Sequence, residues 1–349
     1  MTMLADQVDV VIGIDTHKHT HTASLVTAVT GASLETVTVS TDVAGYRQLI
    51  ELADRHPGAR VWAIEGTGTY GAGLTRHLHA CGEKVFELDR PKRPARRNGA
   101  KTDALDAVRT ARDALALEHN ATPRNSGDRA ALSVLITARR SAVDAAKVAL
   151  LQLHALACAA PETLRARLRG QSRRTIITTA AKLRISSGWD TETRTYAGVL
   201  RDLARRHEAL KAEAKTHETA ITAIIKAWRP DLLAQFGVGP IVAANVLCAW
   251  SHPGRCRNEA AFAKLAGVAP IPASSGLTDK HRLSRFGDRQ LNRALHVVVG
   301  HRLRHDPATQ AYAERRRAQQ KSDRDIKRCL KRYVARQLFR QLENPLDEQ

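Results

Sequence analysis

Apolar and polar residues alternate along the first 125 positions in the manner of strands interrupted by helices. Residues 8–15 form a short apolar run enriched in β-branched residues, residues 23–29 and 31–40 follow with period-two alternation, and all three lie close enough together for hairpins. Residues 41–56 then have the apolar spacing of an amphipathic helix, opened by a Thr-Asp pair suited to a cap. Strand and helix patterns continue in turn over 59–66, 74–81 and 84–89. The pattern predicts a mixed sheet with helices packed on it.

From about residue 126 the pattern becomes helical and rich in Ala, Leu and Arg. Two long helices are predicted, over 130–159 and 193–228, each followed by a proline that ends it. In the second helix the apolar residues recur at alternating spacings of three and four, a heptad seam that His207 and His217 interrupt. The seam has two interpretations: an antiparallel helix pair within one chain, or a coiled-coil contact between two chains.

A third segment begins near residue 231. Its stretch FGVGPIVAANVL places Gly237 and Gly239 in a turn between apolar helical residues, as in a helix-hairpin-helix element, and such a turn can direct backbone N–H groups at a phosphate. After a loop at 270–290, helical patterns continue to about residue 342. We therefore predict an α/β plus α fold: an RNase H-like (RuvC-like) mixed-sheet domain over 1–125, a helical coiled-coil region over 126–230, and a mainly helical domain over 231–349.

Charge separates these segments. The 349 residues include 55 Lys and Arg against 35 Asp and Glu, a net charge of +20. Residues 1–125 hold 15 basic and 15 acidic residues, so the whole surplus belongs to the rest of the chain. A protein this basic is expected to bind a polyanion, and nucleic acid is the first candidate.

Three further features concern the cellular compartment. No apolar run reaches the roughly 20 residues of a membrane helix. The five cysteines are scattered, which excludes a disulfide scaffold and a zinc knuckle, and the N-terminus lacks the pattern of a secretory signal. We expect a cytoplasmic protein with no membrane partner.

Four carboxylates have a spacing that suits a metal site. Asp15 and Glu65 each end a predicted strand, and Asp103 and Asp106 lie three residues apart on one face of a predicted helix. Taken singly, each acid is typical of a cap or a solvated surface. If the two strands are neighbours, however, all four can gather at one edge of the sheet and would need a cation to offset their repulsion. Hard oxygen ligands suit Mg²⁺ or Mn²⁺, and two such ions can clamp the attacking and leaving oxygens of a phosphodiester.

A basic segment, 90–101, stands immediately before Asp103. A solvated charge run is the plain interpretation of such a segment, but beside a carboxylate cluster it would guide a nucleic-acid backbone to the metal, and we favour this second interpretation. Its basic residues are Arg90, Lys92, Arg93, Arg96, Arg97 and Lys101.

Three alternating histidines follow Asp15. In a strand, His17, His19 and His21 would share a face with that carboxylate. Alternating polar residues are usual on the open face of a hairpin, and no soft ligand accompanies these three. We therefore leave them out of the predicted metal site.

Seven motifs, taken together and in this order, resemble the DEDD-type transposases of the IS110 insertion sequences, which are kin to the pilin-gene invertases and the RNA-guided bridge recombinases. They span both ends of the chain and leave only the middle helices unmatched. The resemblance implies a RuvC-like N-terminal domain and a C-terminal domain that holds a nucleophilic serine. The motifs are IGIDTHK, AIEGTGTYG, KTDALDAVRTA, FGVGPIVAANVL, FAKLAGVAPIPASSG, LSRFGDRQLNRAL and LKRYVARQLF.

The resemblance also assigns roles to residues. The family's metal-binding tetrad corresponds to Asp15, Glu65, Asp103 and Asp106. Its nucleophile corresponds to Ser275, which precedes Gly276 as in the family, although Ser274 stands next to it. Arg282 and Arg285, which follow on the same segment, are expected to hold the attacked phosphate.

The activity that the resemblance implies is Mg²⁺-dependent recombination of double-stranded DNA through a covalent phosphoserine. The implied partners are the element ends and target DNA, a structured guide RNA encoded by the element, and further copies of the chain in a dimer or tetramer. Such an enzyme would work in the bacterial cytoplasm, associated with the nucleoid when it acts.

Two other functions are compatible with the residues alone. One is a RuvC-like metal-dependent nuclease or junction resolvase that uses water, in which Ser275 has no chemical role. The other is a basic nucleic-acid-binding protein without enzymatic activity, in which Asp15 is dispensable. A protein–DNA adduct distinguishes the first from a recombinase, and the effect of Asp15→Asn distinguishes the second.

Overall fold

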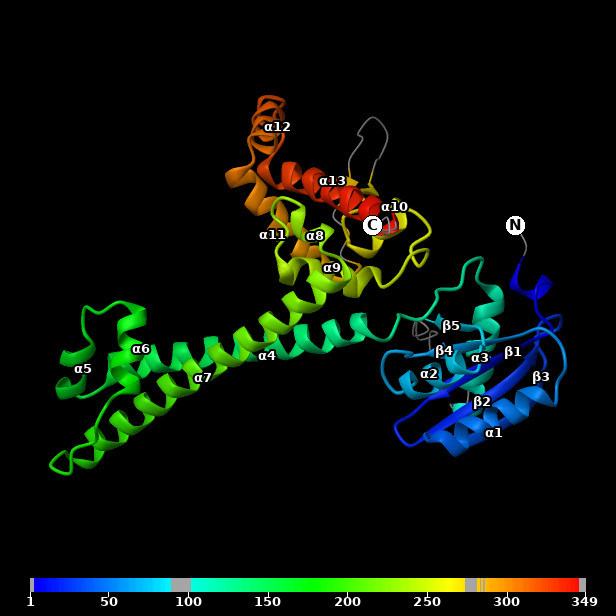
Figure 1. The fold of residues 1–349 in the computed structure, drawn as a ribbon, viewed down its shortest axis with the longest axis horizontal. Coiled ribbons are helices and arrows are strands. Elements are labelled where there is room, and N and C mark those ends of the chain that lie inside the picture. The colour runs from blue at the N-terminus through cyan, green and yellow to red at the C-terminus, as the bar shows by residue number, and fades with distance from the viewer. Residues whose placement is uncertain (1–2, 89–101, 274–280, 283, 285, 345–349) are drawn as a thin grey trace. The chain divides into compact units, whose positions relative to one another are not determined.

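The computed structural model describes residues 3–88, 102–273, 281–282, 284 and 286–344. The chain divides into two compact units, Met1–Ser126 and Gly127–Gln349, and each is described by itself (Figure 1). Our predicted boundary between residues 230 and 231 falls inside the second unit and stays a prediction. Six residues that we assigned to the site lie outside the described residues: Arg93, Arg96, Arg97, Lys101, Ser275 and Arg285.

The first unit contains a five-stranded mixed sheet in the order β3-β2-β1-β4-β5. The first three strands are antiparallel neighbours, whereas β4 runs parallel to both β1 and β5. The predicted strands and their order along the chain are confirmed, and the condition on which the carboxylate site depended is met, because the strand that carries Asp15 lies beside the strand that ends in Glu65. The strands are β1 (Val10–Thr16), β2 (Thr20–Thr27), β3 (Ser33–Ser40), β4 (Arg60–Glu65) and β5 (Val85–Leu88).

Helices cover both faces of this sheet. One face packs on α1 (Val43–Asp54) and α2 (Ala72–Ala80) through a buried cluster that includes Ile14 and Trp62. The other face packs on α3 (Asp103–Ala116), and a short 3-10 helix, η1 (Leu4–Asp6), adds Leu4 to that core. The successive residues of β1 alternate between the two cores, as the pleat of a strand requires.

Gly13 allows α3 to lie against the sheet. A Cβ atom at this position would collide with the Ala107 carbonyl oxygen and the Ala111 amide nitrogen of α3. Only a residue without a side chain therefore lets the helix backbone approach β1 so closely. This contact determines where the first turn of α3 lies relative to the end of β1.

Gly13→Ala is expected to destabilise the first unit by about 1–3 kcal/mol, because two packed backbones would have to separate. Gly68→Ala is the matched control, since a Cβ there meets nothing within 4 Å, and it should change stability by no more than about 0.5 kcal/mol. Hydrogen exchange of the β1 and α3 peptides, followed by mass spectrometry, measures both effects. Equal protection in the two variants would show that the close approach is not needed.

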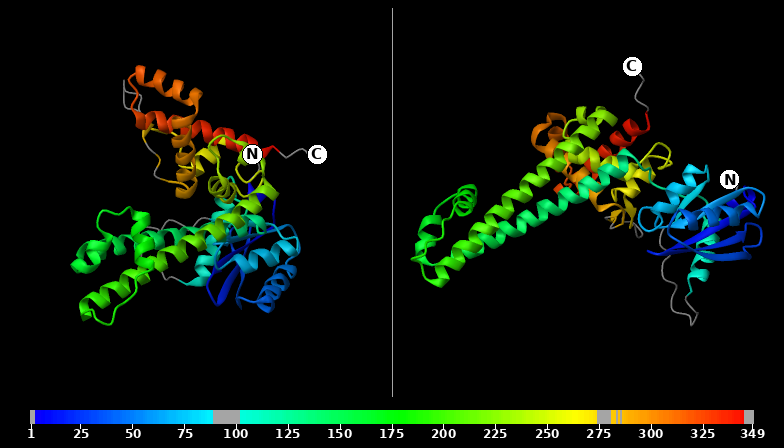
Figure 2. Two further views of the ribbon diagram at one scale, coloured as in Figure 1. Left: turned by 60° about the vertical axis from the view of Figure 1, so that its left-hand side comes forward. Right: turned by 60° about the horizontal axis from the view of Figure 1, so that its bottom comes forward.

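The second unit is built on two long antiparallel helices, α4 (Asp128–Ala159) and α7 (Thr191–Trp228), which Figure 2 shows side by side. Arg139 of α4 binds Glu218 of α7 at 2.9 Å, whereas Ala146 accepts a hydrogen bond from His207 at 2.9 Å. The intramolecular interpretation of the seam is thus confirmed, and His207 is part of the seam. Two short helices, α5 (Glu162–Leu168) and α6 (Arg173–Ala181), complete the far end of the pair.

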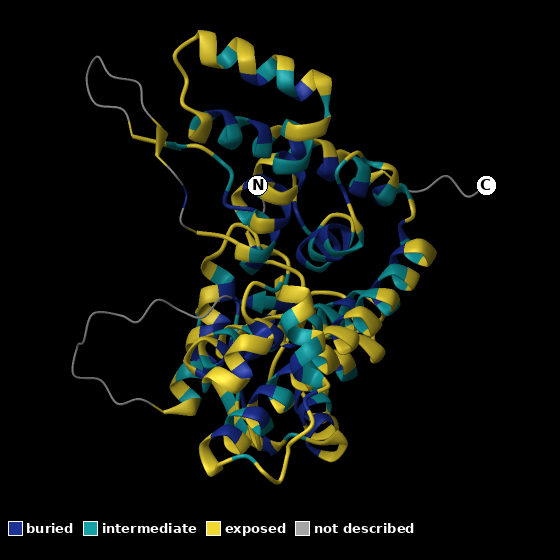
Figure 3. Cartoon of the chain, turned by 90° about the vertical axis from the view of Figure 1, so that its left-hand side faces the viewer, coloured by how far each residue is buried: buried dark blue, intermediate teal, exposed yellow. Residues whose placement is uncertain are grey.

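At the other end of the pair, the long helices share one core with the C-terminal helices. Leu132 of α4 and Ile221 of α7 are buried among residues of α9, α11 and α13. Figure 3 colours the buried positions of the chain dark blue. The remaining elements are α8 (Asp231–Ala234), α9 (Pro240–Trp250), α10 (Glu259–Leu265), β6 (Ile271–Pro272), β7 (His281–Arg282), α11 (Arg289–His305), α12 (Pro307–Ala318) and α13 (Asp323–Glu343).

Among the described helices, α4 is the one that is long and apolar enough to cross a membrane. This is weak evidence for a membrane segment, because packed core helices share both properties. In this structure α4 packs along α7, and its inner face is buried at Ala142, Ala149 and Leu153. We interpret α4 as a core helix of the second unit.

Candidate active site

Two acidic side chains emerge together where β1 and β4 end. The parallel register pairs Gly13 with Ala63 and Ile14 with Ile64, so Asp15 and Glu65 are the next residues on each strand. Both follow the period-two alternation onto the α3 side of the sheet. The end of β4 is also tied to β1, because the Thr16 hydroxyl donates to the Glu65 carbonyl oxygen at 3.0 Å.

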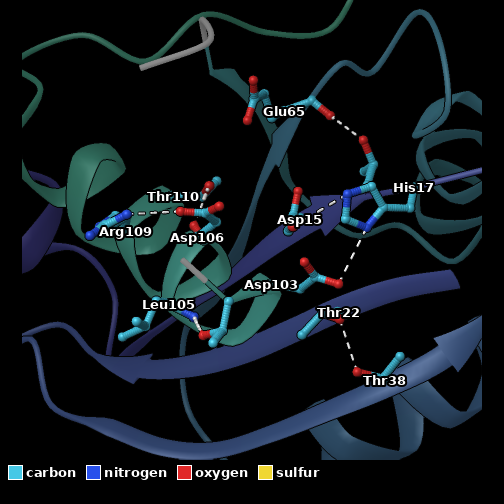
Figure 4. Close-up of polar contacts among 12 residues, drawn as sticks. Asp15, His17, Thr22, Thr38, Glu65, Asp103, Leu105, Asp106, Arg109 and Thr110 are labelled. Carbon is cyan, nitrogen blue, oxygen red and sulfur yellow. Dashed lines mark hydrogen bonds and ion pairs between the residues drawn. The ribbon is translucent and has the colours of Figure 1, made fainter. Parts of the chain in front are cut away.

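The first turn of α3 brings two more carboxylates to this edge. Thr102 caps the helix by accepting a hydrogen bond from the Leu105 amide, and Asp103 and Asp106 follow within the first turn. Acidic residues are favoured there because the helix dipole leaves a partial positive charge at its N-terminus. Figure 4 shows all four carboxylates at the same edge of the sheet.

Within this group, Asp15, His17 and Asp103 form the tightest cluster. Each offers one ligand atom, and these atoms lie within 4.8 Å of one another. The His17 Nε2 atom is 3.9 Å from Asp15 Oδ2, and its Nδ1 atom is 3.5 Å from Asp103 Oδ2. Two carboxylates and an imidazole at this spacing are a donor set that can hold a divalent cation.

The other two predicted ligands flank this cluster. Asp106 accepts a hydrogen bond from Arg109 at 2.9 Å, one turn further along α3, which holds its carboxylate on the same face of the helix. Glu65 stands at the neighbouring strand end (Figure 4). The carboxylates differ in their exposure to solvent: the Asp15 side chain is 15% exposed, whereas that of Asp103 is 54% exposed. Asp15 is thus the enclosed member of the cluster, whereas Asp103 and His17 are open to solvent.

His17 is the residue that the sequence interpretation left out. The three histidines do not share one strand face, because β1 ends at Thr16 and β2 begins at Thr20. The antiparallel register pairs Asp15 with Thr22 and Thr16 with His21, which places His21 on the opposite face. There His21 is fully buried against Tyr46, and burial lowers the pKa of its imidazole. Of the three histidines, His17 is the one whose imidazole lies beside the carboxylates, because it directly follows the last residue of β1.

His17→Ala is expected to weaken Mn²⁺ binding by about 10- to 100-fold, the usual effect of removing a group that supports a metal ligand. His19→Ala is the control, because His19 is exposed in the same turn and belongs to no cluster among the described residues. Electron paramagnetic resonance of a Mn²⁺ titration measures the affinity without any need for catalysis. Equal affinity in the two variants would remove His17 from the site.

The second unit holds the remaining described candidates. Gly237 has a left-handed φ of 84° and packs on α11, where a Cβ would meet Val298 and His301, so its conformation and its neighbours both favour glycine. Gly239 is the N-cap residue of α9, and no atom lies within 4 Å of where its Cβ would be. Arg282 is exposed on β7, which pairs with β6 through Ile271.

Comparison with known proteins shows which protein family this chain matches. A DEDD transposase model of the IS110 type, described as "Transposase", matches residues 12–157. A second model, described as "Transposase IS116/IS110/IS902 family", matches residues 231–314. The chain is also 33% identical over 128 residues to the insertion element IS110 uncharacterized 43.6 kDa protein of Streptomyces coelicolor, a stretch that covers 36% of this chain and 31% of that protein. The chain therefore matches about a third of the length of this curated relative.

The mixed sheet, the acidic edge and the first model together define the first unit as a DEDD-type transposase domain. The second model matches a separate stretch in the second unit. The chain belongs to the IS110 family of transposases.

Proposed function

We propose that this chain is the transposase of an insertion sequence and that it cuts and rejoins double-stranded DNA by transesterification. The observation that carries the proposal is the cluster of Asp15, His17 and Asp103 at the edge of the sheet, in a chain of a transposase family. A phosphodiester is an anion, and it would be attracted to this acidic edge only through a bound cation.

The donor set fits such a cation. Asp15 and Glu65, held by two hydrogen-bonded strand ends, and Asp103 and Asp106, held by the first turn of α3, would bind Mg²⁺ or Mn²⁺, with the His17 imidazole beside Asp15 and Asp103 as a supporting donor. When bound, the metal offsets the negative charge that develops on the attacking and leaving oxygens. Arg109 restrains the Asp106 carboxylate, so that fewer rotamers have to be fixed when the metal binds.

Ser275 is the proposed nucleophile. In the first step its hydroxyl loses a proton and bonds to phosphorus, while the bond from phosphorus to the 3′ oxygen breaks and that oxygen takes up a proton. In the second step a 3′-hydroxyl from another strand attacks the phosphoserine, and the serine leaves with its proton restored. The number of phosphodiester bonds is conserved, so no external energy source is needed. Arg282 and Arg285 would offset the charge on the phosphate in both steps.

The DNA-binding surface is proposed to lie mainly in the second unit. Residues 126–279 and 280–349 carry the whole surplus of positive charge, and backbone amides near Gly237 and Gly239 could bind phosphates at the start of α9. The basic segment with Arg93, Arg96, Arg97 and Lys101 would guide the strand to the carboxylates.

A structured guide RNA is part of the proposal, and it rests on the family alone. Purified protein, element-end DNA, Mg²⁺ and the transcribed flank RNA are expected to give recombined product, and treatment with RNase before DNA is added should abolish it. The control is an unrelated RNA of equal length, which should support no reaction. Equal recombination after RNase treatment would remove the RNA from the mechanism.

The proposed enzyme acts as a homo-oligomer in the bacterial cytoplasm, in contact with the nucleoid. Exposed apolar side chains on α4 support an interface between copies: Val134, Val148 and Leu151 are 69%, 53% and 60% exposed. Their separations place them within about 100° of one another around the helix. A monomeric mass in light scattering of the DNA-bound protein would contradict the oligomer.

A further inference from the structure

A pocket of about 520 Å³ lies in the second unit beside the β6–β7 strand pair. One wall is β7 with residues 267–270, and the other is formed by the end of α12, Lys321 and the first turns of α13. The residues that join β6 to β7 include Ser275. Its size is within the usual range for small-ligand sites, about 300–1,000 Å³.

The lining of the pocket is strongly cationic. Asp325 is the one carboxylate among the described lining residues, and it is bound by Arg328 at 3.0 Å. Arg332 binds Glu259 at 3.1 Å. The pocket is lined by six cations, of which the four other than Arg328 and Arg332 have no carboxylate partner within the described part of the chain. The six cations are Arg282, Arg316, Lys321, Arg328, Lys331 and Arg332.

The hydrogen bonds of these cations leave the positive charge in place. Lys331 donates to the Asn292 amide oxygen at 3.1 Å, and Arg316 donates to the Gln319 amide oxygen at 2.7 Å, so both partners are neutral. Burial lowers the pKa of the Lys331 ammonium, and the neighbouring Arg328 lowers it further. The Nε of Arg316 and an Nη of Arg332 are buried without an acceptor among the described residues. Grouped cations with unused donors favour an anion that accepts several hydrogen bonds.

An aromatic ring adds a second kind of interaction. Tyr333 lines the pocket and is 51% exposed, while its ring packs edge-on against Tyr312 at 5.8 Å between centroids. Aromatic residues are only 4% of the chain, so an exposed ring among arginines and lysines is informative. Cations beside an open ring match a sugar–phosphate unit with its base better than a free phosphate ion.

We propose that this pocket binds a backbone phosphate of the DNA strand that is cut, with Tyr333 against the adjoining nucleotide. The inference rests on the proposed function. We choose DNA as the source of the phosphate because the pocket lies beside the strand pair whose connecting residues include Ser275. Arg316 and Lys331 are the main phosphate-binding residues, since neither is neutralised by a carboxylate and each already donates to a neutral amide oxygen. The pocket would hold the strand in place while the serine reacts.

The test compares two double variants that each remove two positive charges from the full-length protein. Arg316→Gln/Lys331→Gln alters the pocket, whereas Arg324→Gln/Arg340→Gln removes exposed cations of α13 that do not line it. Affinity for a fluorescent duplex with the element-end sequence is measured by anisotropy in EDTA over a series of KCl concentrations. Log affinity falls with log salt, and in the pocket variant this fall should become less steep, by about 0.9 for each phosphate that the protein no longer neutralises. The control variant should reduce the steepness by less than half as much.

Equal slopes in the two variants would overturn the proposal, and so would a weakening confined to the flank RNA, measured in the same way. Arg316→Lys/Lys331→Arg should restore the slope, which separates a local charge effect from misfolding. The proposed function is judged independently, by whether wild-type protein forms a covalent adduct with DNA in the presence of Mg²⁺. Absence of that adduct would refute the serine mechanism and leave the salt slopes to decide the pocket.

Discussion

Asp15→Asn is expected to abolish strand cleavage and joining while DNA affinity stays close to that of the wild type. Asp15 is the most enclosed member of the cluster with His17 and Asp103, and asparagine keeps its shape but removes the charge that holds a cation. Stabilisation of a transition state by a metal is worth several kcal/mol. We therefore expect the rate of strand exchange to fall by about 10³-fold or more. Binding should be kept because the positive surplus lies in the second unit.

The control for this prediction is Asp113→Asn, which removes one exposed carboxylate from the same helix that carries Asp103. Single-turnover recombination and anisotropy binding are measured for both variants. The control should behave as the wild type in both assays. Full recombination by Asp15→Asn would exclude the carboxylate site and leave a basic nucleic-acid-binding protein as the better interpretation.

Ser275→Ala is expected to eliminate the covalent protein–DNA adduct and to lower strand exchange by about 10⁴-fold or more, as removal of a nucleophile usually does. The carboxylates and the cationic pocket are untouched by this change. DNA affinity and its salt dependence should therefore equal those of the wild type. The adduct is scored on denaturing gels after reaction with labelled element-end DNA.

Ser274→Ala is the matched control, since it removes a hydroxyl from the adjacent residue. It should form the adduct at the wild-type level. The reverse result, with the adduct absent in Ser274→Ala and kept in Ser275→Ala, would move the nucleophile by one residue. Undiminished strand exchange in both variants would favour hydrolysis by a metal-activated water, as in a nuclease or junction resolvase.

Much of the first unit could be predicted from the sequence because its signals are local. Short apolar runs and period-two alternation indicated every strand of this unit, and acids that directly follow Ile14 and Ile64 mark two strand ends. Their meeting depends only on β1 and β4 being neighbours, which the topology confirms. The spacing of Asp103 and Asp106 likewise needs only a helix to place both on one face.

His17 escaped prediction because its position depends on a turn. The same alternation that would put three histidines on one face is broken where β1 ends and β2 begins. The sequence does not reveal that register, so His17 and His21 could not be told apart. The signal that could have identified His17 is its separation of two residues from Asp15, combined with a hairpin that closes immediately after it.

The sequence predicts which part of the chain carries the positive charge, but not which residues line the cationic pocket. Charge counting assigns the surplus to the residues after 126. The pocket, however, draws its cations from β7, from α12 and α13, and from the residues between these two helices, and the sequence does not show that these elements enclose one pocket. Which arginines are neutralised depends on tertiary partners such as Glu259, which binds both Arg332 and Arg336. Such pairing has no signature in the sequence.

We propose that the carboxylate edge activates a serine to exchange DNA strands. The most direct measurement is to mix the protein with Mg²⁺, flank RNA and element-end DNA, digest the denatured products, and locate the nucleotide-bearing peptide by mass spectrometry. A phosphodiester-linked peptide that contains Ser275 is expected in the wild type, and it should disappear in Asp15→Asn. Recombined DNA without any linked peptide, or an undiminished link in Asp15→Asn, would contradict this proposal.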